Sequence, residues 1–228
     1  MKLILEKWKS FLAENKKKEI ADLKFGALES EKHKKKISKE PKVIDIKLSD
    51  IPISKFPSNN SAAVKRELKQ VLDSMVDNNE MTAKEIEEAD KNPEKLFIEY
   101  LNDNDLDFDE NLIDNIYEDV SIITLRLKMR YNRPRPEQLG HLVGYDIRSI
   151  KTDTDNTPSF PSGHTTQAWT VAYYLSSKHP DHKKELFEIA EKIEKSRIIR
   201  GAHYPSDNRE ARKIAEKYLF PNIEEKKE

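Results

Sequence analysis

Apolar residues recur at intervals of three or four along the second half of the chain, and this spacing restricts the possible fold more than any other feature. The clearest run places on one helical face the residues Ile113, Ile116, Tyr117, Val120, Ile123, Leu127 and Tyr131. Such a stripe is typical of a helix that buries one side against a core. The helix should end near Asn132, because Pro134 and Pro136 each disfavour helical backbone at the residue before them.

The same spacing predicts further helices over residues 162–177, 183–199 and 205–220. In the first half of the chain it predicts helices near residues 3–15 and 82–102, and one that begins after Ser61 as the N-cap. No stretch alternates like a strand, and only 5 of the 228 residues are glycine, which argues against a turn-rich β fold. We therefore predict an all-α protein with its helices packed around one core.

Charge is unevenly distributed, although the net charge is only -1. Residues 1–42 contain 13 Lys and 7 acidic residues, whereas residues 71–120 contain 17 acidic residues and 3 Lys. We interpret residues 1–42 as a Lys-rich, poorly ordered extension, residues 43–221 as the helical domain and residues 222–228 as a charged tail. A basic arm can bind nucleic acid, but a solvated extension has the same composition, so nucleic acid is not an expected partner.

Several classes of protein are not expected. The chain has no cysteine, so disulfides and thiolate metal sites are excluded. The N-terminus has too few consecutive apolar residues for a signal peptide, and the longest uncharged run, residues 156–177, is far from the ~20 apolar residues of a membrane span. We expect a soluble, cytoplasmic protein. The alternating aspartates of residues 103–109 do not predict calcium, because Phe108 and Asp114 occupy the places where an EF-hand loop has Gly and Glu.

Polar residues stand where three of the predicted helices should face the core. His164 begins one inner face, Arg197 ends a second, and His203 and Asp207 precede the third. Buried charges of this kind need one another or a bound anion. Lys128 and Arg135 add two cations, and the amides of Ser162 and Gly163 open a helix. A helix N-terminus beside Lys and Arg is suited to an oxyanion of phosphate size, and no spacing typical of metal ligands is present.

These residues form a three-part pattern: Lys128, six residues, Arg135-Pro136; Pro161-Ser162-Gly163-His164; and Ser196-Arg197, five residues, His203, three residues, Asp207. The pattern resembles the signature of the type-2 phosphatidic acid phosphatase superfamily, which includes the bacterial class A acid phosphatases and the vanadium haloperoxidases. The gaps between its parts, 24 and 31 residues, lie in the usual range. The resemblance implies the helical bundle of that superfamily.

The resemblance also implies a role for each residue. His203 would attack phosphorus through Nε2, Asp207 would hold Nδ1–H, and His164 would serve as general acid and then base. The phosphate oxygens would be held by Lys128, Arg135, Ser162, Gly163 and Arg197. Arg200 departs from the small or apolar residues that are commoner at its position, and it either adds charge to the rim of the pocket or faces water.

The expected function is thus that of a metal-independent acid phosphatase, which hydrolyses a small phosphate ester through a phosphohistidine. It needs no cofactor, and vanadate should inhibit it. Two alternatives stay open. A vanadium haloperoxidase would hold vanadate as its cofactor in the same pocket, and a non-enzymatic scaffold or nucleic-acid-associated protein would keep only a relict site. The sequence also leaves a homo-oligomer open.

Overall fold

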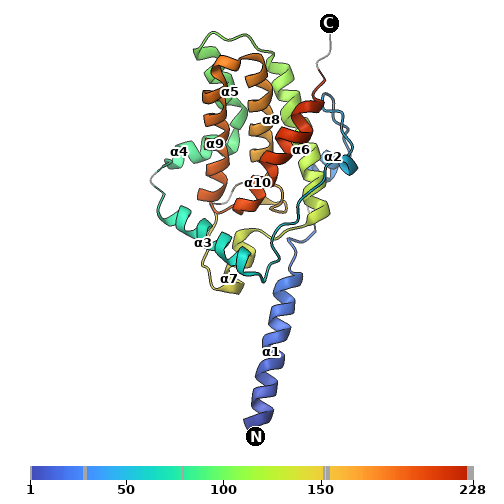
Figure 1. Cartoon of the computed structure of the whole chain (residues 1–228), viewed down its shortest axis with the longest axis vertical. Helices are drawn as coiled ribbons and strands as arrows, with labels where there is room; N and C mark the ends of the chain where they lie inside the picture. Colours follow the sequence, from blue (N-terminus) through green and yellow to red (C-terminus); the bar gives the residue numbers. More distant parts are fainter. Residues whose placement is uncertain (1, 28–29, 79, 151, 153–154, 225–228) are drawn as a thin grey trace.

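A computed structural model describes residues 2–27, 30–78, 80–150, 152 and 155–224. The prediction of an all-α protein is confirmed, since the described residues contain no strand beyond one isolated bridge between Ile44 and Ile223. Figure 1 shows a body of roughly parallel helices from which α1 projects as a separate rod. The α-helices are α1 (Lys2–Asp22), α2 (Glu31–Ile37), α3 (Ala62–Val76), α4 (Ala83–Lys91), α5 (Pro93–Asp103), α6 (Glu110–Tyr131), α7 (Pro136–Val143), α8 (Gly163–Lys178), α9 (Lys183–Ile199) and α10 (Pro205–Ile214).

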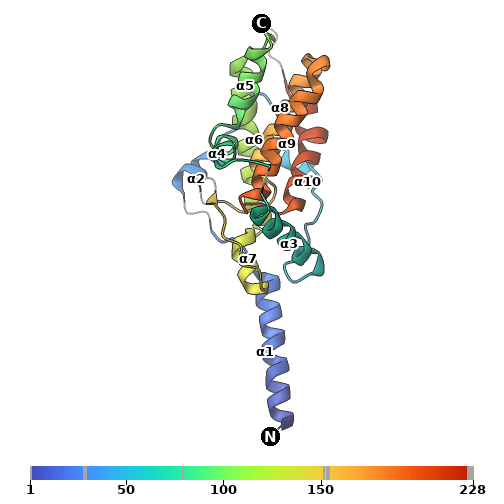
Figure 2. The same cartoon turned by 90° about the vertical axis from the view of Figure 1, so that its left-hand side faces the viewer.

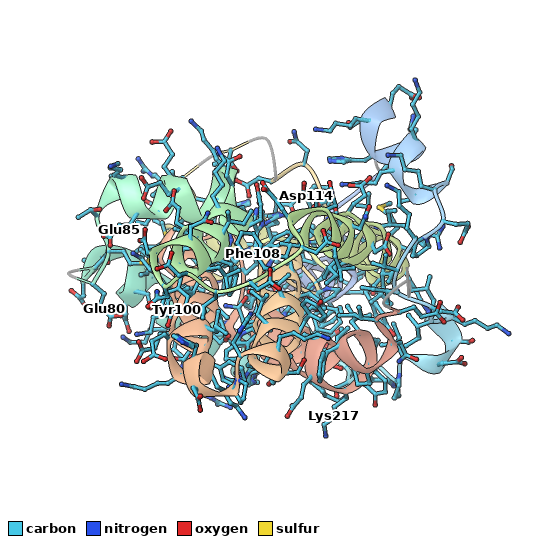
Figure 3. All side chains as sticks on the ribbon, turned by 90° about the horizontal axis from the view of Figure 1, so that it is seen from above. Glu80, Glu85, Tyr100, Phe108, Asp114 and Lys217 are labelled. Atoms are coloured by element: carbon cyan, nitrogen blue, oxygen red, sulfur yellow. The ribbon has the colours of Figure 1, made fainter. Side chains whose placement is uncertain are left out.

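Helix α8 lies at the centre of the bundle and packs against α6, α9 and α10 (Figure 2). Its buried side chains include Ala168, Trp169, Val171, Ala172 and Leu175. They join the stripe of α6 and the inner residues of α9 in one continuous apolar core. Charged side chains lie on the outside of the bundle. Seen from above, Glu80 and Lys217 are at its outer edge (Figure 3).

Helix α6 ends where the sequence predicts. Asn132 is its C-cap, with a left-handed backbone at φ 48°, and its N–H donates to the carbonyl of Lys128 at 2.8 Å. The chain then runs extended through the Pro-rich segment to Arg135, the N-cap of α7, whose first residue is Pro136. Lys128 and Arg135 therefore lie on either side of a fixed corner.

The helix expected near residues 3–15 extends as α1 to Asp22, and two other predicted helices differ from the structure in how they are divided or end. The helix expected over residues 82–102 is divided into α4 and α5, because Pro93 disfavours helical backbone at Asn92, which adopts φ -144° and ψ 62°. The last helix, expected to reach residue 220, is regular only to Ile214 and continues as a π-helical turn over Ala215–Leu219. The division between α4 and α5 places the end of α4 beside the candidate site.

The N-terminal segment has contacts that the sequence analysis did not foresee. Helix α2 packs against α6, and the buried carboxylate of Asp119 accepts the backbone N–H groups of Lys42, Val43 and Ile44 at 2.7–3.0 Å. Residues 31–44 are thus attached to the bundle, whereas poor order was expected up to residue 42. The expected domain limits at residues 42 and 221 stay predictions.

None of the helices in the described ranges combines the length and the apolar character that crossing a membrane requires.

Candidate active site

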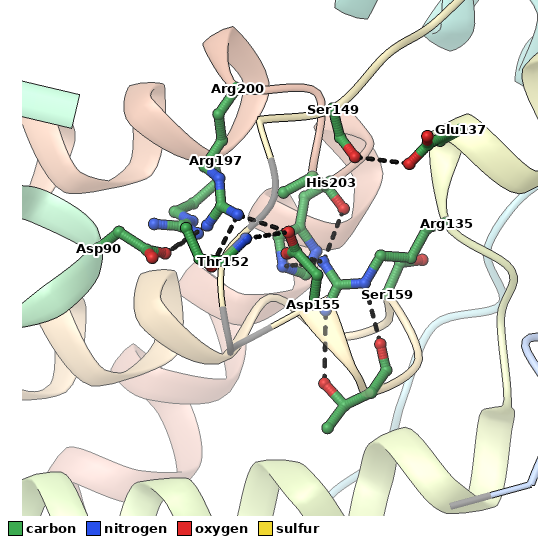
Figure 4. Close-up of polar contacts among 12 residues, drawn as sticks. Asp90, Arg135, Glu137, Ser149, Thr152, Asp155, Ser159, Arg197, Arg200 and His203 are labelled. Carbon is green, nitrogen blue, oxygen red and sulfur yellow. Dashed lines mark hydrogen bonds and ion pairs between the residues drawn. The ribbon is translucent and has the colours of Figure 1, made fainter. Parts of the chain in front are cut away.

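The predicted site residues come from five separate parts of the chain and meet at one end of the bundle. The end of α6 supplies Lys128, the Pro-rich corner supplies Arg135, and the start of α8 supplies residues 162–164. Arg197 belongs to the last turn of α9, His203 lies just before α10, and Asp207 is in the first turn of α10. A cavity of about 220 Å³ is lined by Lys128, Arg135, Gly163, His164 and His203. Ser162, Arg197 and Asp207 are buried. Figure 4 shows Arg197 beside Asp90.

His203 is held in one tautomer by Asp207. Its Nδ1 lies 3.2 Å from Asp207 Oδ2, which also accepts the N–H of Tyr204 at 3.0 Å. Because a carboxylate only accepts, Nδ1 carries the proton and Nε2 keeps its lone pair. Nε2 lies 3.4 Å from Nη1 of Arg135. Burial, followed by the charges of Lys128, Arg135 and Arg197, holds the pKa of His203 well below its ordinary value, so the ring is neutral at physiological pH.

Arg133 fixes Asp207 from the opposite side. It donates to Asp207 Oδ1 at 2.6 Å and to Glu67 Oε2 at 3.1 Å, and its guanidinium stacks 3.8 Å from the centre of the Tyr204 ring. All of its side chain is buried. An arginine in this place orients the second oxygen of Asp207 toward His203.

Lys128 and Arg135 are held by backbone carbonyls. Lys128 Nζ donates to Pro158 O at 2.5 Å, and Arg135 donates to Thr157 O and to Ala202 O at 2.9 Å each. Burial, aided by the neighbouring Arg135, lowers the pKa of Lys128 well below its usual value. An anion in the cavity would stabilise the charged form of this lysine.

The start of α8 presents two amides to the cavity. Ser162 is the N-cap, but its N–H donates to the carbonyl of Asp207 at 3.4 Å and its hydroxyl bonds the hydroxyl of Thr165 at 2.8 Å. Gly163 and His164 lie in the first turn, where amides have no acceptor within the helix, and the described residues supply none. Of the amides expected from the sequence, those of Gly163 and His164 are thus free for an oxyanion, whereas that of Ser162 already has an acceptor, and its contact with phosphate stays a prediction.

His164 is tied to α4. Its Nε2 lies 3.0 Å from the backbone carbonyl of Asp90, so Nε2 carries a proton and Nδ1 is the nitrogen that remains for a substrate. Burial and the charge of Arg197 lower the pKa of His164 to about 3, despite the opposing effect of Asp90. The ring is therefore neutral in the free protein.

Asp90 joins the two arginines of α9. Its Oδ1 accepts from Arg197 Nη2 at 2.5 Å and from Arg200 Nη1. Burial alone would raise the pKa of Asp90, but Arg197, His164 and Arg200 together lower it to about 2. Arg200 also donates to Asp155 at 2.6 Å and is fully buried. The expectation that Arg200 lies at the rim of the pocket or faces water is therefore wrong.

Arg197 retains unused donors. Nε and Nη1 are buried and have no hydrogen-bond partner among the described residues, although Nη2 is bound to Asp90. Buried donors without partners destabilise a protein by about 1–3 kcal/mol each. An oxyanion that accepted a hydrogen bond from either of these groups would relieve part of this cost.

The residues that sequence reasoning missed are Asp90, Arg133, Glu67 and Asp155. Arg133 lies next to the motif, but its partner Glu67 is 66 positions away, and Asp90 is 107 positions from Arg197. Both acids interrupt an apolar stripe, Glu67 between Val64 and Val71 and Asp90 after Ile86, so the sequence carried a signal for their burial but none for their partners. Within the described ranges, no three His, Cys, Asp or Glu side chains are grouped as a metal site would require.

Comparison with known proteins identifies the region that carries these residues. Residues 119–212 match the PAP2 superfamily. The chain contains a PAP2 superfamily domain. The PAP2 domain includes every residue of the three-part pattern, and the resemblance seen in the sequence is confirmed.

Relatives of the PAP2 domain include acid phosphatases. The chain is 36% identical over 96 residues to an acid phosphatase of Zymomonas mobilis, an alignment that covers 40% of this chain and 33% of that protein. It is 32% identical over 109 residues to a non-specific acid phosphatase of Providencia stuartii, covering 46% and 42%. The chain thus spans about a third to two fifths of the length of these relatives.

Among solved structures, a transmembrane PAP2-type phosphatidylglycerolphosphate phosphatase from Bacillus subtilis aligns with a TM-score of 0.47 and 18% identity. The alignment covers 68% of this chain and 82% of that protein.

Proposed function

We propose that this protein is a phosphatase that hydrolyses phosphate monoesters through a phosphohistidine at His203. One observation carries the proposal: His203 lines a cavity shared with two cations, and its Nδ1 is bound to Asp207, so that Nε2 is an unprotonated nucleophile. The similarity of the PAP2 domain to acid phosphatases supports the same reaction class.

In the first step, the lone pair of His203 Nε2 forms a bond to phosphorus while the bond from phosphorus to the ester oxygen breaks. The leaving oxygen takes a proton from His164 Nδ1. In the second step, His164 removes a proton from water, the resulting hydroxide attacks phosphorus, and the bond between nitrogen and phosphorus breaks. A general acid that becomes the base of the next step is common in covalent catalysis.

Charge on the three transferred oxygens is stabilised by groups fixed before substrate binds. These groups are Arg135, Lys128, the amides of Gly163 and His164, and Arg197 through a buried donor without a partner among the described residues. Preorganised donors of this kind commonly give the largest part of the rate enhancement in phosphoryl transfer. They supply positive charge without a divalent ion, so we propose that the reaction is metal-independent.

The protonation of His164 follows from its lowered pKa. Since the ring is neutral in the free protein, the catalytic proton arrives with the substrate, whose phosphate is a monoanion below its second pKa of about 6. Transfer of that proton to His164 leaves a dianion beside an imidazolium. We therefore expect kcat/KM to fall above about pH 6, which makes this an acid phosphatase.

The test of the nucleophile is rapid quench with a radiolabelled ester. We expect a phosphoenzyme that is labile in acid and stable in base, and we expect His203→Ala to lose both the label and turnover of p-nitrophenyl phosphate. His141→Ala is the matched control, since His141 is exposed on α7 away from the cavity. Label that persists in His203→Ala would refute the assignment.

The test of metal independence uses EDTA and vanadate together. Turnover should survive EDTA, and vanadate should inhibit competitively and more tightly than phosphate, because it can adopt the five-coordinate geometry of the transition state. Activity lost in EDTA and restored by a divalent ion would overturn the mechanism. Rapid bromination by the vanadate-loaded protein with bromide and peroxide would favour the haloperoxidase alternative.

A further inference from the structure

Helix α2 forms one wall of the candidate active site. Lys32, His33 and Lys36 line the same cavity as Lys128 and His203, although α2 precedes the PAP2 domain by more than eighty residues. The helix is held in this place by α6, since Arg126 Nε donates to the carbonyl of Ile37 at 3.0 Å and Lys36 Nζ donates to Ser121 Oγ at 2.8 Å. The PAP2 motif does not require this wall, so its chemistry is a property of this chain.

The position of α2 along α6 suits the leaving group of a substrate. Ser121, Leu125 and Lys128 all line the cavity and follow one another at intervals of four and three, on one face of α6. With a rise of 1.5 Å per residue, Ser121 lies roughly 10 Å along the helix from Lys128. Lysine side chains from α2 can therefore reach a group attached to the phosphate, but they are too far along the helix to replace the cations that hold the phosphate itself.

Helix α2 adds positive charge to the cavity, in addition to the cations that would bind the transferred phosphate. In the proposed function, a phosphate already has Lys128 and Arg135 in the cavity lining and the buried Arg197 as cationic partners. Lys32 adds a further charge and has no ion-pair partner among the described residues, while Lys36 is paired with Glu118 at 2.9 Å. Where the cavity is described, its lining includes neither Asp nor Glu.

His33, in the same wall, has a buried ring nitrogen without a partner among the described residues. Its Nδ1 is buried and makes no hydrogen bond within the described structure. Partial burial and the charges of Lys32, Lys36 and Lys128 lower the pKa of His33, so its ring is neutral and can donate through one nitrogen. A neutral donor between two lysines is suited to an anionic oxygen.

We infer that α2 provides a second anion-binding subsite, and that the substrate is a phosphate monoester whose leaving group carries another anionic group, a phosphate or a carboxylate. This inference rests on the proposed phosphatase function and names the class of ester. Lys32 and Lys36 hold the second anion through charge, and His33 donates a hydrogen bond to it. None of the three takes part in the bond-breaking step.

The test compares two aryl esters of nearly equal shape, 4-carboxyphenyl phosphate and 4-carbamoylphenyl phosphate. We expect the protein to favour the carboxylate in kcat/KM. In Lys32→Gln/Lys36→Gln this preference should fall about three- to tenfold, as two solvated ion pairs allow, with kcat/KM for the amide nearly unchanged. The intrinsic difference in leaving group cancels when the ratio of the two esters is compared between proteins.

The matched control is Lys34→Gln/Lys35→Gln, which removes the same charge from exposed positions of α2 outside the cavity. It should keep the preference. A second pair of substrates, glycerol 1,3-bisphosphate and glycerol 1-phosphate, repeats the comparison with phosphate as the second anion. The preference should also shrink as salt rises, because these charges are partly solvated.

The outcomes separate this inference from the function on which it rests. An equal preference in the cavity variant and in the control would overturn the subsite while phosphatase activity remains. No turnover of any ester by the unmodified protein would instead overturn the proposed function, and the subsite with it. Because Lys36 also supports the packing of α2, the single variant Lys32→Gln, which removes no hydrogen bond or ion pair among the described residues, must lower the preference as well.

Discussion

Neither the backbone conformation nor the packing of the folded protein requires glycine at position 163. The backbone of Gly163 is ordinary helix, and a Cβ added there would lie 3.7 Å from Lys128 Cε and 3.8 Å from Thr124 Oγ1, which are normal contacts. Packing therefore tolerates alanine at this position. Yet the added methyl group would stand between the amides of α8 and a bound phosphate, where only glycine allows close approach.

We expect Gly163→Ala to fold with an unchanged or slightly raised melting temperature and to lose at least about tenfold in kcat/KM. The two measurements are a thermal melt and a p-nitrophenyl phosphate assay. Gly140→Ala is the contrasting variant, since its Cβ would lie 2.9 Å from the carbonyl of Tyr145 and should destabilise the fold without entering the cavity. A fully active Gly163→Ala would show that phosphate does not approach this turn.

At the scale of elements, the end of α4 positions two arginines and a histidine. The interruption at Asn92 and Pro93 stops α4 so that Asp90 is buried between Arg197 and Arg200. Without this carboxylate, two guanidinium groups would repel one another at low dielectric. Asp90 is therefore a positioning residue, which acts on the phosphate through Arg197.

Asp90→Asn should lower the free energy of unfolding by about 3–5 kcal/mol, the usual cost of leaving one partner of a buried pair. It keeps the carbonyl that holds His164. Inorganic phosphate should then raise the melting temperature of Asp90→Asn more than that of the unmodified protein, because the anion replaces the lost charge. Equal shifts in both proteins would mean that Asp90 supports the fold but not the anion site.

Removal of α1 and removal of α2 should have different effects on the selectivity of the protein for anionic esters. Helix α1 projects from the body and is exposed over most of its described side chains, with Ile20 as its buried contact near the end (Figure 1). A chain that begins at residue 19 should keep its turnover and its melting temperature. A chain that begins at residue 42 lacks the wall that α2 provides and should lose selectivity for anionic esters. Equal activity and selectivity in both shortened chains would contradict the role of α2.

At the scale of the whole molecule, the buried histidines tie stability to pH. The pKa values of His164, lowered to about 3, and of His203, also lowered, lie below the value of about 6.5 in an unfolded chain. Between pH 6.5 and 4 the unfolded state therefore binds more protons than the folded state, and the free energy of unfolding falls as the pH falls.

Each histidine should contribute a slope approaching about 1.4 kcal/mol per pH unit below pH 6. Denaturant titrations at several pH values measure this slope, and His164→Gln/His203→Gln should flatten it. Phosphate in the buffer should also reduce it, because the anion favours protonated His164. A slope that the double variant leaves unchanged would show that other groups control acid unfolding.

The sequence by itself determined the helical class, the end of α6 at Asn132 and the residues of the PAP2 pattern. It could do so because these features depend on short spacings: apolar stripes repeat every three or four residues, Pro134 acts on its neighbour, and Asp207 is one turn from His203.

Only the tertiary structure decided what surrounds that pattern. Asp90 is 107 positions from Arg197, Glu67 is 66 positions from Arg133, and α2 reaches the cavity by packing on a helix some 85 positions further along. Glu67 and Asp90 interrupt the apolar stripes of their helices, but nothing in the sequence indicates which distant charge each of them meets. They become buried partners because the packing of helices brings distant positions together, and a buried charge then needs whichever opposite charge the fold has placed beside it.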